Sequence, residues 1–144
     1  MPGPSSFVPP RVRPSRPVRR FSLAQANATL PLVKRIVGDV VRVNGDAVQI
    51  QDELEIVKDS KKQTQLQKDL EGKATRMAEL VSELTDIGVE LKDAAIGLVD
   101  FIGRNKGNDV YLCWKLGEEQ IGFWHELQAG VAGRKPISTL EESE

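Results

Sequence analysis

The chain has 144 residues, of which 40% are hydrophobic and 28% charged, proportions typical of one soluble domain with a moderate core. Its formal net charge is -1, but residues 1–20 contain arginines and no acid, so the remainder is acidic and is not an obvious nucleic-acid binder. A single cysteine excludes an internal disulfide. One cysteine with one histidine also excludes a structural zinc site built only from thiolates and imidazoles.

No membrane or export segment is recognisable in the sequence. No apolar run approaches the ~20 residues needed to span a bilayer. The start, MPGPSSFVPP, lacks the apolar core of a signal peptide. We therefore expect a cytoplasmic protein that does not contact a membrane.

Residues 1–20 are expected to form a disordered tail. They hold most of the prolines of the chain, interleaved with serine and arginine, and such a segment buries too little apolar surface to fold. The alternative is a basic arm for RNA, DNA or an acidic partner. Nucleic acid is expected to bind only here, through five arginines: Arg11, Arg13, Arg16, Arg19 and Arg20.

A first long helix is predicted after residue 21. Ser22 and Gln25 form a capping box, and Phe21 can serve as a hydrophobic staple. Pro31 is expected to kink or restart the helix, because proline cannot donate its amide and disfavours helix in the residue before it. From residue 36 the apolar residues alternate at spacings of four and three, which is typical of a coiled-coil seam. They are Ile36, Val40, Val43, Ala47, Ile50, Leu54 and Val57.

A second helix is predicted after a turn at residues 59–62, and it ends before Gly88, which stands where a left-handed C-cap is wanted. Its apolar positions are Leu66, Leu70, Ala74, Met77, Val81, Leu84 and Ile87. Because the heptads continue across Gly45, we expect a continuous first helix there. The two helices would form an antiparallel, coiled-coil-like hairpin. Its apolar stripe predicts a homodimer that closes a four-helix bundle, or else a sheet of the same chain that covers the stripe.

A small antiparallel sheet is predicted after the hairpin. Three short strands are expected at residues 98–102, 110–116 and 121–125, separated by loops at 103–109 and 117–120. The predicted fold is therefore α+β and mainly α. We expect one domain over residues 21–137, followed by an acidic C-terminal tail at 138–144.

The register of this sheet decides which side chains meet. We expect Leu116 opposite Ile121 and Ile102 opposite Val110. This pairing places Asp100 and His125 on one face, about 10 Å apart across two strand spacings. Cys113 falls on the other face, so we interpret it as a small core residue rather than a nucleophile acting with His125.

The single histidine suggests acid–base or metal chemistry. His125 and Glu126, with Asp100, Glu118 or Asp93, can supply a histidine–carboxylate metal site or an acid–base pair if they converge. Adjacent residues of a strand point to opposite faces, however, so His125 and Glu126 cannot both join such a site. We therefore expect no metal or other cofactor, and a half-buried His125 that is hydrogen-bonded to Asp100.

Arg134 is the best candidate for binding an anion. Glycines near it let the backbone approach a ligand, and its guanidinium can grip a carboxylate or phosphate with two bonds. An ion pair with a carboxylate of the chain, from Asp100 or Glu118, is an equally good interpretation. The expected ligand-binding residues, which would form a polar pocket beside an indole ring, are Asp100, Trp114, Glu118, His125 and Arg134.

Six segments carry a family resemblance: FSLAQANATLPLV, IGVELKD, GLVDF, VYLCWKLGE, IGFWHEL and GVAGRKPI. In this order they resemble a bacterial family known as domain of unknown function 2203. The resemblance covers about residues 21–137. It implies a helical hairpin with a small sheet, and it implies no activity.

The expected function is that of a cytoplasmic, dimeric module whose polar pocket binds a protein partner or a small anionic ligand. One alternative is a small enzyme that uses Asp100 and His125 for acid–base chemistry, or a histidine–carboxylate metal site. The second alternative is association with nucleic acid through the N-terminal tail.

Overall fold

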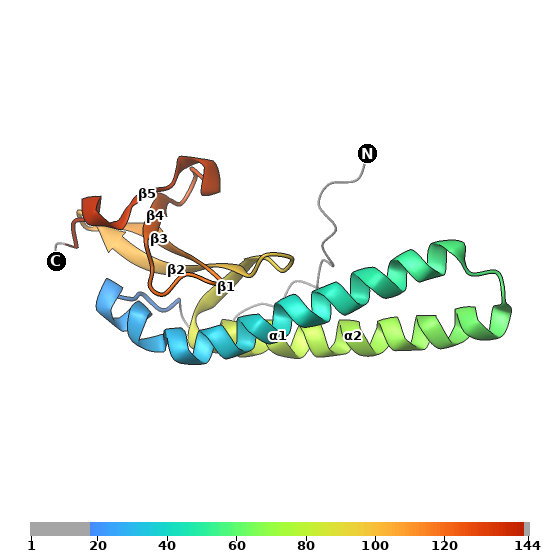
Figure 1. Ribbon diagram of the computed structural model, residues 1–144. Helices are drawn as coiled ribbons and strands as arrows, with labels where there is room; N and C mark the ends of the chain where they lie inside the picture. Colours follow the sequence, from blue (N-terminus) through green and yellow to red (C-terminus); the bar gives the residue numbers. More distant parts are fainter. Residues whose placement is uncertain (1–17, 143–144) are drawn as a thin grey trace.

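The computed structural model describes residues 18–142, and it consists of a long helical hairpin with a sheet over one end (Figure 1). The expected α+β class, mainly helical, is confirmed. The predicted number of strands is wrong, since the antiparallel sheet has five strands in the order β1-β2-β3-β4-β5. The helices are α1 (Leu23–Ile56) and α2 (Ser60–Ile87), and the strands are β1 (Val89–Asp93), β2 (Leu98–Asn105), β3 (Asn108–Lys115), β4 (Phe123–Glu126) and β5 (Lys135–Pro136).

The start of α1 follows the sequence signals. The Ser22 side chain accepts a hydrogen bond from the Gln25 amide at 3.1 Å, and the Gln25 side chain accepts one from the Ser22 amide at 2.9 Å. The predicted capping box is thus confirmed. Pro31 lies inside a helix that continues without a restart, and Figure 1 shows that α1 changes direction along its N-terminal part, as a missing amide allows. The helix also continues through Gly45, as expected.

The turn between the helices is shorter than predicted. It comprises residues 57–59, because the Asp59 side chain accepts a hydrogen bond from the Lys62 amide at 3.2 Å and so caps α2. The predicted turn at 59–62 therefore lies mostly inside the helix. At the other end, Gly88 adopts the left-handed conformation with φ 101°, which confirms the expected C-cap.

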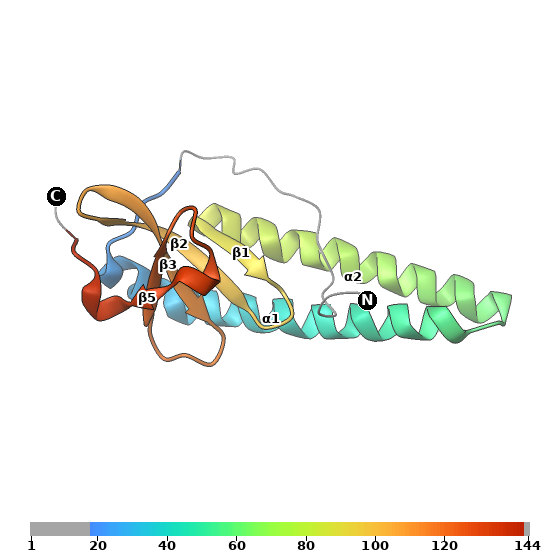
Figure 2. The same cartoon turned by 90° about the horizontal axis from the view of Figure 1, so that it is seen from above.

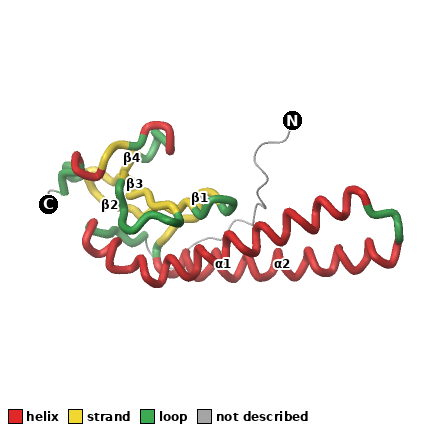
Figure 3. Tube along the Cα trace, in the orientation of Figure 1, coloured by secondary structure: helices red, strands yellow, loops and turns green. Residues whose placement is uncertain are grey.

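The sheet covers only one end of the hairpin (Figures 2 and 3). At that end the α1 seam is buried from Ile36 to Ala47, whereas Ile50, Leu54 and Val57 in the distal part are only half-buried. The alternative in which a sheet of the same chain covers the stripe is therefore met in part, since the sheet covers the proximal half, and the homodimer stays a prediction. Within residues 18–142, neither helix is long and apolar enough to cross a membrane.

A tight turn joins β2 to β3, where the sequence analysis expected a long loop at 103–109. The turn residues Lys106 and Gly107 have positive φ values of 51° and 81°, the pattern of a two-residue hairpin turn. Both strands therefore continue to the turn. Gly103 lies within β2 because Leu112 packs over it, and an added Cβ would stand 2.8 Å from Leu112.

Both predicted registers are wrong by one residue. Ile102 opposes Tyr111 instead of Val110, and Cys113 opposes Phe123. A shift of one residue exchanges the two faces of a strand. The face towards the helices is therefore apolar and carries Val99, Phe101, Leu112, Trp114 and Trp124. The outer face carries Asp100, Tyr111, Cys113, Phe123 and His125.

The segments next to both ends contact the body of the protein. Arg20 forms a bidentate ion pair with Asp109 at 2.8 and 2.9 Å, and Arg19 stacks on Phe21 at 4.4 Å. Glu141, within the predicted C-terminal tail, accepts a backbone hydrogen bond from Lys106 at 2.7 Å. The other tail arginines lie in residues 1–17, outside the described part of the chain.

Gly97, in the turn between β1 and β2, lies against α1 and supplies a test of this packing. It has φ 71°, and an added Cβ would stand 2.8 Å from Val37 of α1. Gly97→Ala is expected to lower the free energy of unfolding by about 2–4 kcal/mol through backbone strain and overpacking. Gly45→Ala is the matched control. Its Cβ would meet nothing within 4 Å, so about 0.5–1 kcal/mol of stabilisation is expected. Urea denaturation followed by circular dichroism measures the free energy of unfolding of both variants. Equal changes in the two would contradict the packing described.

Candidate functional site: a buried Asp–Cys–His cluster

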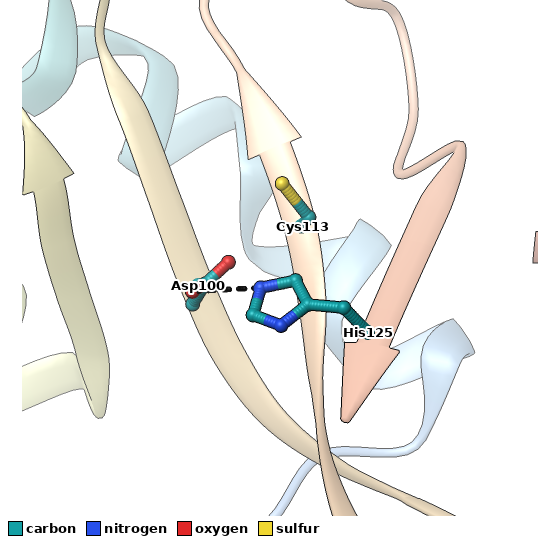
Figure 4. Close-up of side chains that lie close together, drawn as sticks. All are labelled: Asp100, Cys113 and His125. Carbon is teal, nitrogen blue, oxygen red and sulfur yellow. Dashed lines mark hydrogen bonds and ion pairs between the residues drawn. The ribbon is translucent and has the colours of Figure 1, made fainter. Parts of the chain in front are cut away.

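Three chemically reactive side chains converge on the outer face of the sheet, on the side away from the helices (Figure 4). Asp100 comes from β2, Cys113 from β3 and His125 from β4. Asp100 lies directly opposite Cys113, and His125 lies diagonally across β3 from Asp100. One potential ligand atom from each residue lies within 4.8 Å of the other two.

The cluster is buried although it lies on the face away from the core. The exposed fractions are 1% for Asp100, 1% for Cys113 and 2% for His125. The segment after β4 folds back over this face of the sheet (Figures 1 and 2). Arg134, which follows the short helix η1 (Val131–Gly133), stacks on Phe123 with 4.2 Å between its guanidinium carbon and the ring centroid. The cluster is thus excluded from water on both sides.

The hydrogen bonds of His125 define the state of its ring. Its Nδ1 lies 2.9 Å from the backbone oxygen of Glu126, and because a carbonyl oxygen can only accept, Nδ1 carries a proton. Its Nε2 lies 3.2 Å from Oδ2 of Asp100. A neutral ring protonated at Nδ1 has a bare Nε2, and an ionised carboxylate is also an acceptor. Something positive must therefore lie between these two atoms, either a proton or a metal cation.

Asp100 has bonding capacity that the described residues do not use. Its Oδ1 is buried and has no hydrogen-bond partner in the described part of the chain. Burial raises the pKa of Asp100, while the charges of His125 and Lys92 oppose that rise. A buried carboxylate oxygen without a partner is unfavourable, so Oδ1 of Asp100 has the capacity to form one more bond.

Cys113 is not a nucleophile in this environment. Burial raises the pKa of its thiol to about 11, and the charge of Asp100 acts in the same direction. The neighbouring guanidinium of Arg134 lowers the pKa, but less strongly. The thiol is therefore protonated at neutral pH. The prediction that Cys113 lies on the opposite face from His125 is wrong, because the register is shifted by one residue.

The rim of the cluster carries three further polar side chains. Lys92 and Glu90 of β1 form an ion pair at 2.7 Å, and the Lys92 ammonium stands 4.8 Å from the centre of the Tyr111 ring. Arg134 lies on the other side. Among the described residues, no carboxylate is within ion-pair distance of Arg134, so the interpretation that it pairs with Asp100 or Glu118 is wrong.

The structure brings some of the predicted site residues together and separates others. The expected hydrogen bond between Asp100 and His125 is confirmed, and Arg134 lies beside the same cluster. Trp114 is instead in the core, on the other face of the sheet, where its Nε1 donates to the backbone oxygen of Glu118 at 3.0 Å. The expected pocket beside Trp114 is therefore wrong, again because of the register.

The remaining carboxylates are engaged elsewhere. Glu118 accepts a hydrogen bond from the Lys115 amide at 2.7 Å, and Asp93 accepts one from the Ala95 amide at 2.9 Å. Glu126 pairs with Lys135 at 3.1 Å. Cys113 was considered as a partner of His125 from the sequence and was rejected because the predicted register put the two on opposite faces. Only the strand register, which fixes the faces of three strands at once, can reveal that relation.

Fold and cluster together define a small α+β protein with a buried three-residue centre on the outer face of its sheet. The chain belongs to the family described as Uncharacterized conserved protein (DUF2203), whose model matches residues 19–137. The family named from the sequence motifs is thereby confirmed. No curated protein and no solved structure matches the chain.

Substitution of Asp100 tests the arrangement without any metal. In Asp100→Asn the side-chain amide can donate to Nε2 of His125 and no charge is buried, so the free energy of unfolding is expected to stay equal or to rise. Asp100→Ala leaves Nε2 without a partner and is expected to lower the free energy of unfolding by about 1–3 kcal/mol. Guanidinium denaturation at neutral pH, with a chelator present, compares the two variants with the wild type. If Asn destabilises as much as Ala, the hydrogen bond described here is not formed.

Proposed function

We propose that this protein is a metal-binding module in which Asp100, Cys113 and His125 hold one divalent transition-metal ion, for which zinc is the best candidate. The observation that carries the proposal is the close approach of Nε2 of His125 and Oδ2 of Asp100, 3.2 Å apart, beside a buried thiol. A cation between them satisfies both atoms.

The spacing of the three residues is suited to a tetrahedral ion. With zinc bonds of about 2.0–2.3 Å, neighbouring ligand atoms of a tetrahedral site lie about 3.3–3.6 Å apart. The distance between Nε2 and Oδ2, 3.2 Å, is already close to this value. All three ligand atoms lie within 4.8 Å of one another, so small side-chain rotations bring them into range. No backbone movement is required.

The ligand set favours zinc over the hard cations. Calcium and magnesium prefer oxygen ligands throughout, whereas thiolate and imidazole select borderline and soft ions such as zinc. The bond from Nδ1 of His125 to the Glu126 carbonyl is the partner that a metal-bound imidazole commonly has, and it leaves Nε2 free to bind the ion. A bound cation would also release the proton of the Cys113 thiol.

Burial argues against the other interpretations of the site. A substrate cannot reach Asp100 and His125 directly for acid–base chemistry, since their exposed fractions are 1% and 2%. A small anion against the Asp100 carboxylate would meet a like charge. Catalytic zinc typically has three protein ligands and one open position, and the burial of this cluster gives a substrate no direct access to such a position.

Metal binding is expected to be stoichiometric and to depend on all three side chains. Protein stripped with a chelator should take up one zinc ion per chain, measured by native mass spectrometry. At a hundredfold excess of zinc over Kd, the free energy of unfolding should rise by about 2.7 kcal/mol. Asp100→Asn and Cys113→Ser should lose this uptake. Glu126→Gln, which changes an exposed carboxylate on the next residue, is the control and should retain it. Uptake that is absent in the wild type, or equal in all variants, would rule the site out.

We also propose that the distal half of the hairpin packs against a second copy of the chain. The support is the apolar seam of α1, which continues to Val57 after the cover of the sheet has ended.

A pair of substitutions tests this assembly. Ile50→Asp places a charge in the seam and is expected to convert a dimer into a monomer, because an unpaired charge in an apolar interface is strongly unfavourable. Ile56→Asp is the matched control, since Ile56 is 79% exposed and lies off the seam. Light scattering over a range of concentrations gives the mass. A wild type that is monomeric throughout, or two variants that behave alike, would contradict the proposal.

A further inference from the structure

We infer that charge holds the second copy of the chain in one orientation, with the end of α1 of each copy beside the start of α2 of the other. This inference rests on the assembly proposed above. It assigns the contact surface to the tip of the hairpin, which comprises residues 46–56 of α1 and 60–68 of α2. Figure 1 shows this tip at the end of the hairpin that the sheet does not cover.

Charges of opposite sign are segregated at the tip. Its α1 part contains four acids and no lysine or arginine, and its α2 part contains three lysines and no acid. The acids are Asp46, Asp52, Glu53 and Glu55, and the lysines are Lys61, Lys62 and Lys68. The turn between the helices carries one charge of each sign, Lys58 and Asp59, and so leaves the balance unchanged. The tip therefore presents an acidic helix next to a basic one.

These charges are arranged against the helix dipoles. Cations stabilise the C-terminal end of a helix, and anions stabilise its N-terminal end. The last turn of α1 has no basic residue and carries Glu53 and Glu55. The first turn of α2 has no acidic residue and carries Lys61 and Lys62. Each pair destabilises the helix that carries it, so helix formation gives no reason for this pattern.

Ion pairs within the chain do not account for the pattern either. Asp46 pairs with Lys73 of α2 at 3.2 Å. Among residues 18–142, the other acids and the lysines of the tip take part in no ion pair, and all of them are exposed. Their charges are therefore available to a partner.

The apolar residues next to these charges indicate which partner fits. Ile50 and Leu54 of α1 are half-buried, and so is Leu70 of α2 just beyond the tip. Glu53 directly precedes Leu54 and lies at the margin of the apolar stripe, where charges set partner choice and orientation in coiled coils. A second copy offers the same stripe with the same margins. The end of α1 facing its own copy would oppose acids to acids, whereas the end of α1 beside the start of α2 opposes acids to lysines. A two-fold axis repeats this contact, so each dimer contains it twice.

Charge reversal in two variants of the full chain tests this orientation. Glu53→Lys with Glu55→Lys makes the end of α1 basic, and Lys61→Glu with Lys62→Glu makes the start of α2 acidic. Each variant alone opposes like charges at both contacts, so its dimer dissociation constant is expected to rise about tenfold. An equimolar mixture restores opposite charges at both contacts, so heterodimers should exceed the share of about one half that random association gives. Sedimentation equilibrium measures the dissociation constants, and native mass spectrometry measures the share of heterodimers.

The control changes the net charge by the same amount away from the tip. Asp86→Lys with Glu119→Lys reverses two exposed acids, one near the end of α2 and one in the segment between β3 and β4, and should leave the dissociation constant unchanged. Circular dichroism compares the helix content of all variants. If a double variant loses helix content, the single variants Glu53→Lys and Lys62→Glu are mixed in the same way and judged by the same criteria.

The outcomes separate the two proposals. If the wild type is monomeric at every concentration, the assembly and this inference both fail. If the wild type is a dimer and both reversed variants dimerise equally well, the assembly stands and the role of the charges is overturned. Reversed variants that dissociate but do not pair in the mixture would overturn the contact between α1 and α2.

Discussion

The register of β2, β3 and β4 is the constraint on which the rest of the structure depends. The two-residue turn at Lys106 and Gly107 fixes the pairing of β2 with β3. That pairing sends Phe101 towards the helices and Asp100 to the outer face. A slip by one residue would bury a carboxylate in the core and expose its largest side chains, so the apolar pattern and the turn enforce the same arrangement. The core and the candidate site are thus consequences of one alignment.

The buried cluster is difficult to explain by stability alone. A carboxylate with an unpaired oxygen, an imidazole and a thiol occupy positions where apolar side chains of similar size would pack at less cost. The apolar core of the protein lies on the other face of the sheet. Their convergence from three separate strands is an argument in support of the metal site proposed above.

The sequence predicted the helices well because their signals are local. Caps at Ser22 and Gly88 and an apolar repeat of seven residues can be read without any knowledge of distant contacts. The sheet depends on long-range pairing and was predicted less well. β5 has only two residues, and it is defined as a strand by its pairing with β4. β1 contains charged residues and was not recognised as a strand from the sequence, although it pairs with β2.

The errors in the candidate site have the same origin. The two register predictions were wrong by one residue in opposite directions, so the errors cancelled for Asp100 and His125, which were correctly placed together. They did not cancel for the strand between them. Cys113 and Trp114 therefore exchanged faces, and the cysteine was assigned to the core while the tryptophan was assigned to the site. The alternation of apolar and polar residues within one strand cannot reveal a shift relative to its neighbour, because the alternation is equally regular in both registers.

The location of the centre links metal binding to the order of the C-terminal part of the chain. β4 is a strand of four residues that pairs with β5, and Arg134 stacks on Phe123 of β4. A cation shared by Asp100, Cys113 and His125 would join β4 to β2 across β3, in addition to the backbone ladder. A metal site formed by distant segments does not exist in the unfolded chain. The free energy of metal binding would therefore add to the free energy of folding. The helical hairpin lies on the opposite side of the sheet (Figure 1). A second copy packed on its distal half would therefore not cover the outer face of the sheet.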